Sequence, residues 1–161
     1  LTFAFTQNEH LLKTKNHILL LVLTLVLASC NYKESSIPER SVYLERNLNT
    51  QALELRTIGG YKTYTVAEQY GDALGYGGLL VIYGFDQTYY AFDLACPNEL
   101  KSSVRVVPDN SGQAVCSTCG SVFSIGYGSG NRLSGPAKEG LRKYQVSSYE
   151  SVSGRIIQVT R

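Results

Sequence analysis

The chain has 161 residues, with 15 lysines and arginines against 13 aspartates and glutamates, and a formal net charge of +2. A balance this close to neutral gives no electrostatic reason to expect a nucleic acid as a partner. The only two histidines, His10 and His17, lie near the start of the chain. Histidine-based catalysis and histidine-based metal binding are therefore excluded for the remainder.

The first predicted segment is an export signal over residues 1–29. Two lysines precede an apolar run at 18–27, and two small residues follow it. The run is shorter than the roughly 20 apolar residues that a membrane-spanning helix needs. A charged front and a small-residue exit are typical of a cleaved signal peptide. The chain contains no methionine, so residues 1–12 need not belong to the translated signal.

A cysteine, Cys30, ends the tetrapeptide LASC directly after the apolar run. This tetrapeptide resembles the lipobox of bacterial lipoproteins, in which the cysteine becomes the lipidated first residue of the mature protein. The resemblance implies a chain that is exported and anchored to a cell-envelope membrane, because each buried methylene of an acyl chain contributes about 0.8 kcal/mol. The alternative is an ordinary buried cysteine. Residues 30–40 are polar and are interpreted as the lipidated N-terminus and a linker.

Residues 41–161 are predicted to form one small antiparallel all-β domain, a sandwich or a barrel. Only one helical turn, near Thr65, is supported by capping-box spacing. In one strand Asp93 is expected to face outward, because Phe92 and Leu94 face inward. Turn sequences lie at 84–87, 109–112 and 151–154. Alternating segments rich in valine and tyrosine predict strands at 41–48, 61–66, 78–84, 88–96, 103–107, 141–146 and 155–161.

Three further cysteines, Cys96, Cys116 and Cys119, each come at the end of a predicted strand. Loops at strand ends can meet in a β domain, so the three thiols can converge. Zinc and iron–sulfur clusters both prefer thiolate ligands. The spacing Cys-x-x-Cys-Gly is that of a metal knuckle, in which glycine tolerates the positive φ angle that follows the second cysteine.

The two cysteine loops resemble the ligand loops of Rieske [2Fe–2S] proteins. Cys96-Pro-Asn98 is followed after 17 residues by Cys116-Ser-Thr-Cys119-Gly-Ser-Val-Phe, which is similar to the family pattern C-x-H … C-x-x-H-G-S-x-F/Y. The later segment SGPAKEGLRKYQV is similar to the family's loop that shields the cluster and the strand after it. The resemblance covers about 79–146. It implies a three-layered antiparallel fold, an electron-transfer role and a [2Fe–2S] cluster supported by Gly120, Ser121 and Pro136.

The chain departs from this family at both histidine positions, which are occupied by Asn98 and Cys119. A centre with two cysteine and two histidine ligands cannot be built from residues 30–161, because they contain no histidine. The signal also lacks the arginine pair of the twin-arginine signals that exported Rieske proteins typically use. Both departures favour an altered or vestigial site.

Three alternatives for the thiols stay open. The first is a metal-free site, with or without a disulfide from Cys96 to Cys116 or Cys119. The second is zinc or another single metal ion, held by the three thiolates and by Glu99, which lies three residues after Cys96. Asn98 is a weaker ligand candidate because its amide is neutral. The third is an unusual [2Fe–2S] centre with a fourth ligand other than cysteine.

The predicted function is that of an exported, membrane-anchored redox or metal-binding module with an unknown redox or protein partner. The alternative from another class is a cluster-free interaction module on the same scaffold. No nucleophile with an adjacent base and no carboxylate pair can be identified, so an independent enzyme is not expected. The glycines of GYGSGN at 126–131 lack the strand–loop–helix setting of a phosphate loop and are interpreted as a surface loop.

Overall fold

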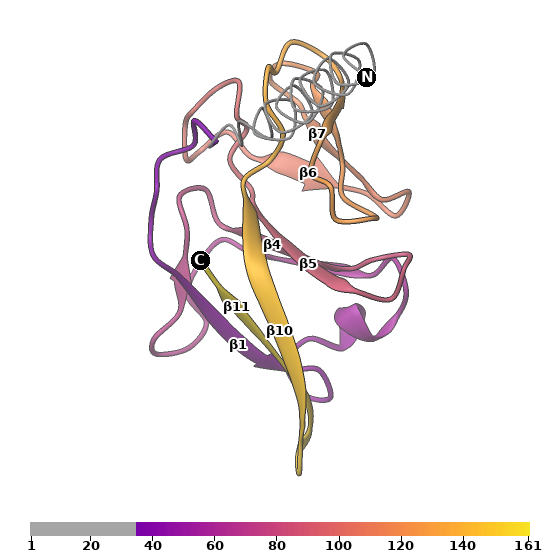
Figure 1. Ribbon diagram of the computed structural model, residues 1–161. Coiled ribbons are helices and arrows are strands. Elements are labelled where there is room, and N and C mark those ends of the chain that lie inside the picture. Colours follow the sequence, from indigo (N-terminus) through magenta and orange to yellow (C-terminus); the bar gives the residue numbers. More distant parts are fainter. Residues whose placement is uncertain (1–34) are drawn as a thin grey trace, which may run out of the picture. The chain divides into compact units, whose positions relative to one another are not determined.

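The computed structural model describes residues 35–161 (Figure 1). The predicted export signal, Cys30 and the first part of the linker lie outside the described residues. Within that part no helix is long and apolar enough to cross a membrane. The prediction of an all-β domain is confirmed, with one 3₁₀ helix, η1, as the exception. The elements are β1 (Val42–Asn47), η1 (Leu53–Arg56), β2 (Tyr61–Tyr64), β3 (Ala73–Leu74), β4 (Leu79–Tyr83), β5 (Tyr89–Asp93), β6 (Val106–Pro108), β7 (Gln113–Cys116), β8 (Val122–Ser124), β9 (Arg132–Ser134), β10 (Lys143–Ser151) and β11 (Gly154–Thr160).

The strands form two antiparallel sheets. The larger sheet has the order β2-β4-β5-β10-β11-β1-β3, and the smaller has the order β6-β7-β8-β9. Strand β10 divides its length between two neighbours: Lys143 and Tyr144 pair with β5, whereas the stretch from Gln145 onward pairs with β11. Strand β10 therefore exchanges one neighbouring strand for another along its length. The half of the larger sheet that contains β4 and β5 and the half that contains β11 and β1 pack against each other across an apolar core.

The side chains of β4 point alternately into two separate cores. Leu79 and Val81 join one apolar cluster with residues of β1 and β11, while Leu80 and Ile82 join another with residues of β6, β7 and β8. The β4–β5 hairpin is thus a middle layer, with the smaller sheet on one side and β1, β10 and β11 on the other (Figure 1). A strand buried on both faces needs apolar residues at successive positions, and β4 has them.

This middle position corrects the expectation for Asp93 at the end of β5. The side chain was expected to face outward, but it is fully buried. Its carboxylate accepts hydrogen bonds from the N–H groups of Tyr76 (2.8 Å), Gly77 (2.9 Å) and Ala95 (2.8 Å), and from the Tyr144 hydroxyl (2.8 Å). Alternation correctly assigned Phe92 to one face, but the opposite face packs against a second layer instead of water. The buried carboxylate is tolerated because four donors replace its hydration.

The three predicted turns are confirmed as the connections of the hairpins β4–β5, β6–β7 and β10–β11. The prediction of a helical turn near Thr65 is wrong, because residues 65–72 form an irregular loop. In this loop the backbone N–H groups of Glu68 and Gln69 donate hydrogen bonds to the Asp72 carboxylate, both at 2.9 Å. Local backbone donors that are satisfied by a side chain do not need a helix.

Candidate metal centre

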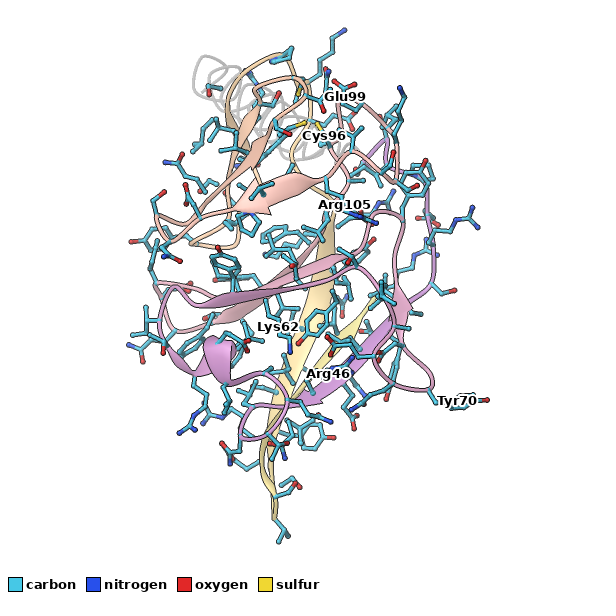
Figure 2. All side chains as sticks on the ribbon, turned by 180° about the vertical axis from the view of Figure 1, so that it is seen from behind. Arg46, Lys62, Tyr70, Cys96, Glu99 and Arg105 are labelled. Carbon is cyan, nitrogen blue, oxygen red and sulfur yellow. The ribbon has the colours of Figure 1, made fainter. Side chains whose placement is uncertain are left out.

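The three cysteines of the domain converge at one end of the smaller sheet. Cys96 lies in the loop between β5 and β6, Cys116 is the last residue of β7, and Cys119 lies in the turn before β8. Their three Sγ atoms lie within 4.8 Å of one another, and the Cys96 and Cys119 sulfurs are 3.6 Å apart. Figure 2 shows the sulfur at Cys96 near Glu99, at the end of the domain opposite Arg46. The predicted convergence of the thiols is therefore confirmed.

The first cysteine loop is fixed by backbone hydrogen bonds around Cys96. The Cys96 N–H donates to the carbonyl of Val104 at 3.0 Å, and the Cys96 carbonyl accepts from the N–H groups of Glu99 and Leu100. Leu100 closes this tight turn with a φ angle of +53°, a left-handed conformation that non-glycine residues adopt rarely. The loop is thus closed by hydrogen bonds to both backbone groups of Cys96.

The second cysteine loop is a tight turn with a glycine at its left-handed position. The Gly120 N–H donates to the Cys116 carbonyl at 2.8 Å, and the Cys116 N–H donates to the Ser121 carbonyl at 2.9 Å. Gly120 has a φ angle of +72°, although no atom lies within 4 Å of where a Cβ would stand. The glycine is therefore needed for its backbone conformation and not for space, as the knuckle spacing predicted.

A third segment, between β9 and β10, is held against the second loop by Ser121. The Ser121 hydroxyl oxygen is buried, accepts the Ala137 N–H at 3.0 Å and lies 3.1 Å from the Cys119 sulfur. A Cβ at Gly135 would stand 2.4 Å from the Ser121 Cα, so the two segments are in backbone contact. Pro136, between them, is exposed. Ser121 thus contacts both Cys119 and the segment between β9 and β10, whereas no contact to the thiols is found for Pro136 among the described residues.

The surroundings affect the protonation of two of the thiols in opposite directions. Burial raises the pKa of the Cys96 thiol to about 12. Partial burial alone would also raise the pKa of Cys119, but hydrogen bonds from Ser121 and the neighbouring thiols outweigh this and lower it. Cys96 and Cys116 are fully buried and Cys119 is half-buried. The site therefore has two enclosed sulfurs and one that solvent can reach.

The spacing of the sulfurs fits one metal ion. Metal–sulfur bonds of about 2.3 Å in a tetrahedral site place sulfur ligands about 3.8 Å apart. The 3.6 Å between Cys96 and Cys119, with Cys116 inside the same 4.8 Å group, agrees with three ligands around a single centre. A Rieske centre with two cysteine and two histidine ligands does not fit, since residues 35–161 contain no histidine.

The two other proposed ligands are not brought into this group. Asn98 is exposed, and its side-chain amide donates a hydrogen bond of 2.9 Å to the Glu99 carboxylate. The carboxylate of Glu99 is not among the potential ligand atoms that gather within 4.8 Å, which belong to the three cysteines alone. Both residues lie in the turn that the Leu100 N–H closes onto the Cys96 carbonyl, and residue spacing does not reveal such a turn.

Two residues that support the first cysteine loop were missed in the sequence. The Arg105 Nε donates to the Gly77 carbonyl at 2.5 Å, and the Tyr76 hydroxyl donates to the Leu100 carbonyl at 3.1 Å. They tie the loop of Cys96 to the segment before β4. An arginine and a tyrosine that bind distant backbone carbonyls carry no local sequence signal.

The glycine-rich stretch at 126–131 has a packing role. A Cβ at Gly128 would stand 2.2 Å from the ring of Tyr90, and a Cβ at Gly126 would stand 2.5 Å from the ring of Phe85. The backbone therefore lies directly on aromatic side chains of the β4–β5 hairpin. The interpretation of the stretch as a loop is confirmed, and Gly126 and Gly128 are buried against these rings.

Comparison of the chain with models of protein families gives no match, and comparison with curated proteins gives none either. The relation to the Rieske family therefore stays a resemblance, carried by the two cysteine loops and the segment after β9.

Proposed function

We propose that this chain is a metal-binding module in which Cys96, Cys116 and Cys119 hold one thiophilic metal ion. The observation that carries the proposal is the convergence of three sulfurs, from two loops, inside 4.8 Å. Three cysteines seldom meet by chance in a domain with only three, and soft thiolates select zinc, copper(I) or iron. Zinc is the first candidate because three thiolates leave one tetrahedral position open, as in reactive zinc sites.

The enclosure of the sulfurs supports a tightly held ion. Cys96 and Cys116 are fully buried at the end of the apolar core between the two sheets. Two buried thiolates would be costly without a cation, so ion binding and ionisation of these thiols are coupled. The half-buried Cys119 lies on the open side, where water or a small ligand would occupy the fourth position.

The module is proposed to act at a membrane surface, tethered through lipidated Cys30, and to deliver its metal ion to a partner. Delivery of an electron would require copper or iron in place of zinc, because zinc is not redox-active. No independent catalysis is proposed. A [2Fe–2S] cluster is the less favoured occupant, because the three sulfurs are grouped around one position and no histidine is available in residues 35–161.

The test is elemental analysis with a visible spectrum on the full chain purified without oxygen. One equivalent of zinc in a colourless protein is the expected result, and cobalt(II) should replace it with intense thiolate-to-metal absorption. Cys116→Ala should lose the ion, whereas Glu99→Ala should keep it, which separates three-thiol binding from a site with a glutamate ligand. Two equivalents of iron with a Rieske-type or ferredoxin-type spectrum would overturn the proposal. A metal-free protein that still binds a partner would favour the cluster-free interaction module.

A further inference from the structure

We infer that Cys119 and Cys96 also form a dithiol/disulfide pair that exchanges with the disulfide of another molecule, Cys119 attacking and Cys96 resolving. This activity goes beyond metal binding, because it uses two of the same thiols when no ion is bound. The two proposals can be disproved independently, since a protein can bind metal without exchanging disulfides and can exchange disulfides without binding metal.

The distance between the two sulfurs carries the inference. They stand 3.6 Å apart, whereas a disulfide bond requires about 2.05 Å. The remaining approach is about 1.5 Å, which side-chain rotation can supply when the two sulfurs already face each other. The two cysteines are 23 positions apart and lie on different loops. Their bond would close a large loop and so restrict the unfolded chain more than a bond within Cys-x-x-Cys would.

The difference in exposure assigns the two roles. Cys119 is the half-buried member, in the turn where Ser117 and Thr118 are exposed, so an external disulfide can reach it. Cys96 is fully buried and can be reached only by a sulfur already inside the site. An incoming disulfide must therefore react first at Cys119. Cys96 then completes the exchange by attacking the Cys119 sulfur from inside the site.

The exchange balances with one external disulfide, R–S–S–R, as the oxidant. The Cys119 thiolate attacks one of its sulfurs, the R–S–S–R bond breaks, and the departing R–S⁻ takes up a proton. The Cys96 thiol then loses its proton and attacks Cys119 Sγ. The mixed disulfide breaks and the second R–S⁻ leaves as RSH. Two electrons pass from the protein thiols to the external disulfide, and the product is a Cys96–Cys119 bond with two RSH.

Formation of this bond would remove two of the three ligands and leave Cys116 alone. Oxidation would therefore release the proposed metal ion, and a bound ion would protect the thiols from exchange. The two chemistries of the site are mutually exclusive at any moment, although each is testable without the other.

Peptide mapping of the unmodified full chain tests the pairing without any substitution. The chelated protein is treated with oxidised glutathione, quenched in acid, alkylated and digested with trypsin. Cleavage after lysine and arginine places Cys96 in peptide 63–101 and both Cys116 and Cys119 in peptide 106–132. We expect the two peptides to be cross-linked, with the alkyl group on Cys116. A disulfide confined to peptide 106–132, or glutathione that stays attached without further reaction, would overturn the inference.

Substitutions then test the order of the steps. In Cys96→Ala the glutathione adduct on Cys119 should accumulate instead of disappearing. Thr118→Ala, a change in the same exposed turn, should react as the parent does. Circular dichroism of each variant establishes that it is folded. If the adduct in Cys96→Ala is lost as fast as in the parent, Cys96 is not the resolving thiol and the inference fails.

Discussion

The hydroxyl of Tyr144 on β10 donates a hydrogen bond of 2.8 Å to the carboxylate of Asp93 at the end of β5, and both side chains are buried. Asp93 also binds the N–H groups of Tyr76 and Gly77, in the segment that Arg105 ties to the first cysteine loop. One carboxylate therefore connects β5 of the middle layer, the neighbouring strand β10 of the same sheet and the support of the candidate metal centre.

Removal of the Tyr144 hydroxyl should destabilise the domain by about 2 kcal/mol, as loss of a hydrogen bond to a charged group does. Burial and the neighbouring Asp93 raise the pKa of Tyr144, so the hydroxyl remains a donor through the neutral range. Urea denaturation of Tyr144→Phe measures the change. Tyr149→Phe is the control, because Tyr149 lies on an exposed part of the same strand, and it should stay within about 0.5 kcal/mol of the parent. Equal stabilities for the two variants would contradict the role of Asp93.

The ion pair between Arg46 and Asp72 predicts a larger effect. The guanidinium is 1% exposed and makes two hydrogen bonds to the carboxylate, at 2.9 and 2.6 Å. Asp72→Ala leaves a buried cation with only Glu68, 3.5 Å from Nε, as a charged neighbour. We expect a loss of about 3 kcal/mol in the free energy of unfolding. Glu150→Ala, which breaks the exposed pair with Arg155, is the matched control and should change stability by under about 1 kcal/mol.

The same pair predicts how stability depends on pH. The hydrogen bond from Arg46 holds the pKa of Asp72 below its ordinary value of 3.8, outweighing burial, which raises it, and N–H groups of Gln69 and Glu68 add to the lowering. A depressed carboxyl pKa stabilises the fold fully above the ordinary value, and this contribution is lost as the pH falls through the lowered one. Asp72→Asn should therefore show a shallower loss of stability than the parent below about pH 4. Parallel acid titrations followed by circular dichroism would reveal this, and identical slopes would refute it.

The sequence predicted the parts of this fold that depend on local pattern. Alternation located the long strands, turn residues located the hairpins, and cysteines at strand ends predicted the convergence of the three thiols. Prediction from the sequence failed where packing between distant parts of the chain determines whether a side chain is buried or a strand forms. Asp93 is buried because a second layer covers its face, and β9 was missed because its three residues are all exposed and show no alternation. The Glu99 carboxylate is outside the group of three thiols, and the left-handed turn at Leu100 next to it could not be predicted, because leucine rarely adopts a positive φ angle.

The contact of the glycine-rich loop with the middle layer predicts a steric effect. Gly128→Ala would place a Cβ 2.2 Å from the Tyr90 ring at a φ angle of +70°, so both a clash and backbone strain result. We expect a loss of about 2 to 3 kcal/mol. Gly71→Ala is the control, since its φ angle is +94° but no atom lies within 4 Å of the new Cβ. Thermal denaturation of both variants isolates the clash, and equal losses would indicate that strain alone is responsible.

Ser121 is expected to affect both protein stability and the proposed metal binding at the candidate centre. Ser121→Ala removes the acceptor of the Ala137 N–H and the hydroxyl 3.1 Å from the Cys119 sulfur, both in a fully buried position. The orphaned N–H should cost about 1 to 2 kcal/mol in stability. Loss of a group that orients a ligand should weaken zinc binding by about tenfold or more, measured by competition with a chromogenic chelator. Ser117→Ala is the matched control, because Ser117 is exposed in the same turn and should change neither quantity. A Ser121→Ala protein with lower stability but unchanged zinc affinity would show that Ser121 shapes only the turn, because the proposed ligand Cys119 would then be oriented without it.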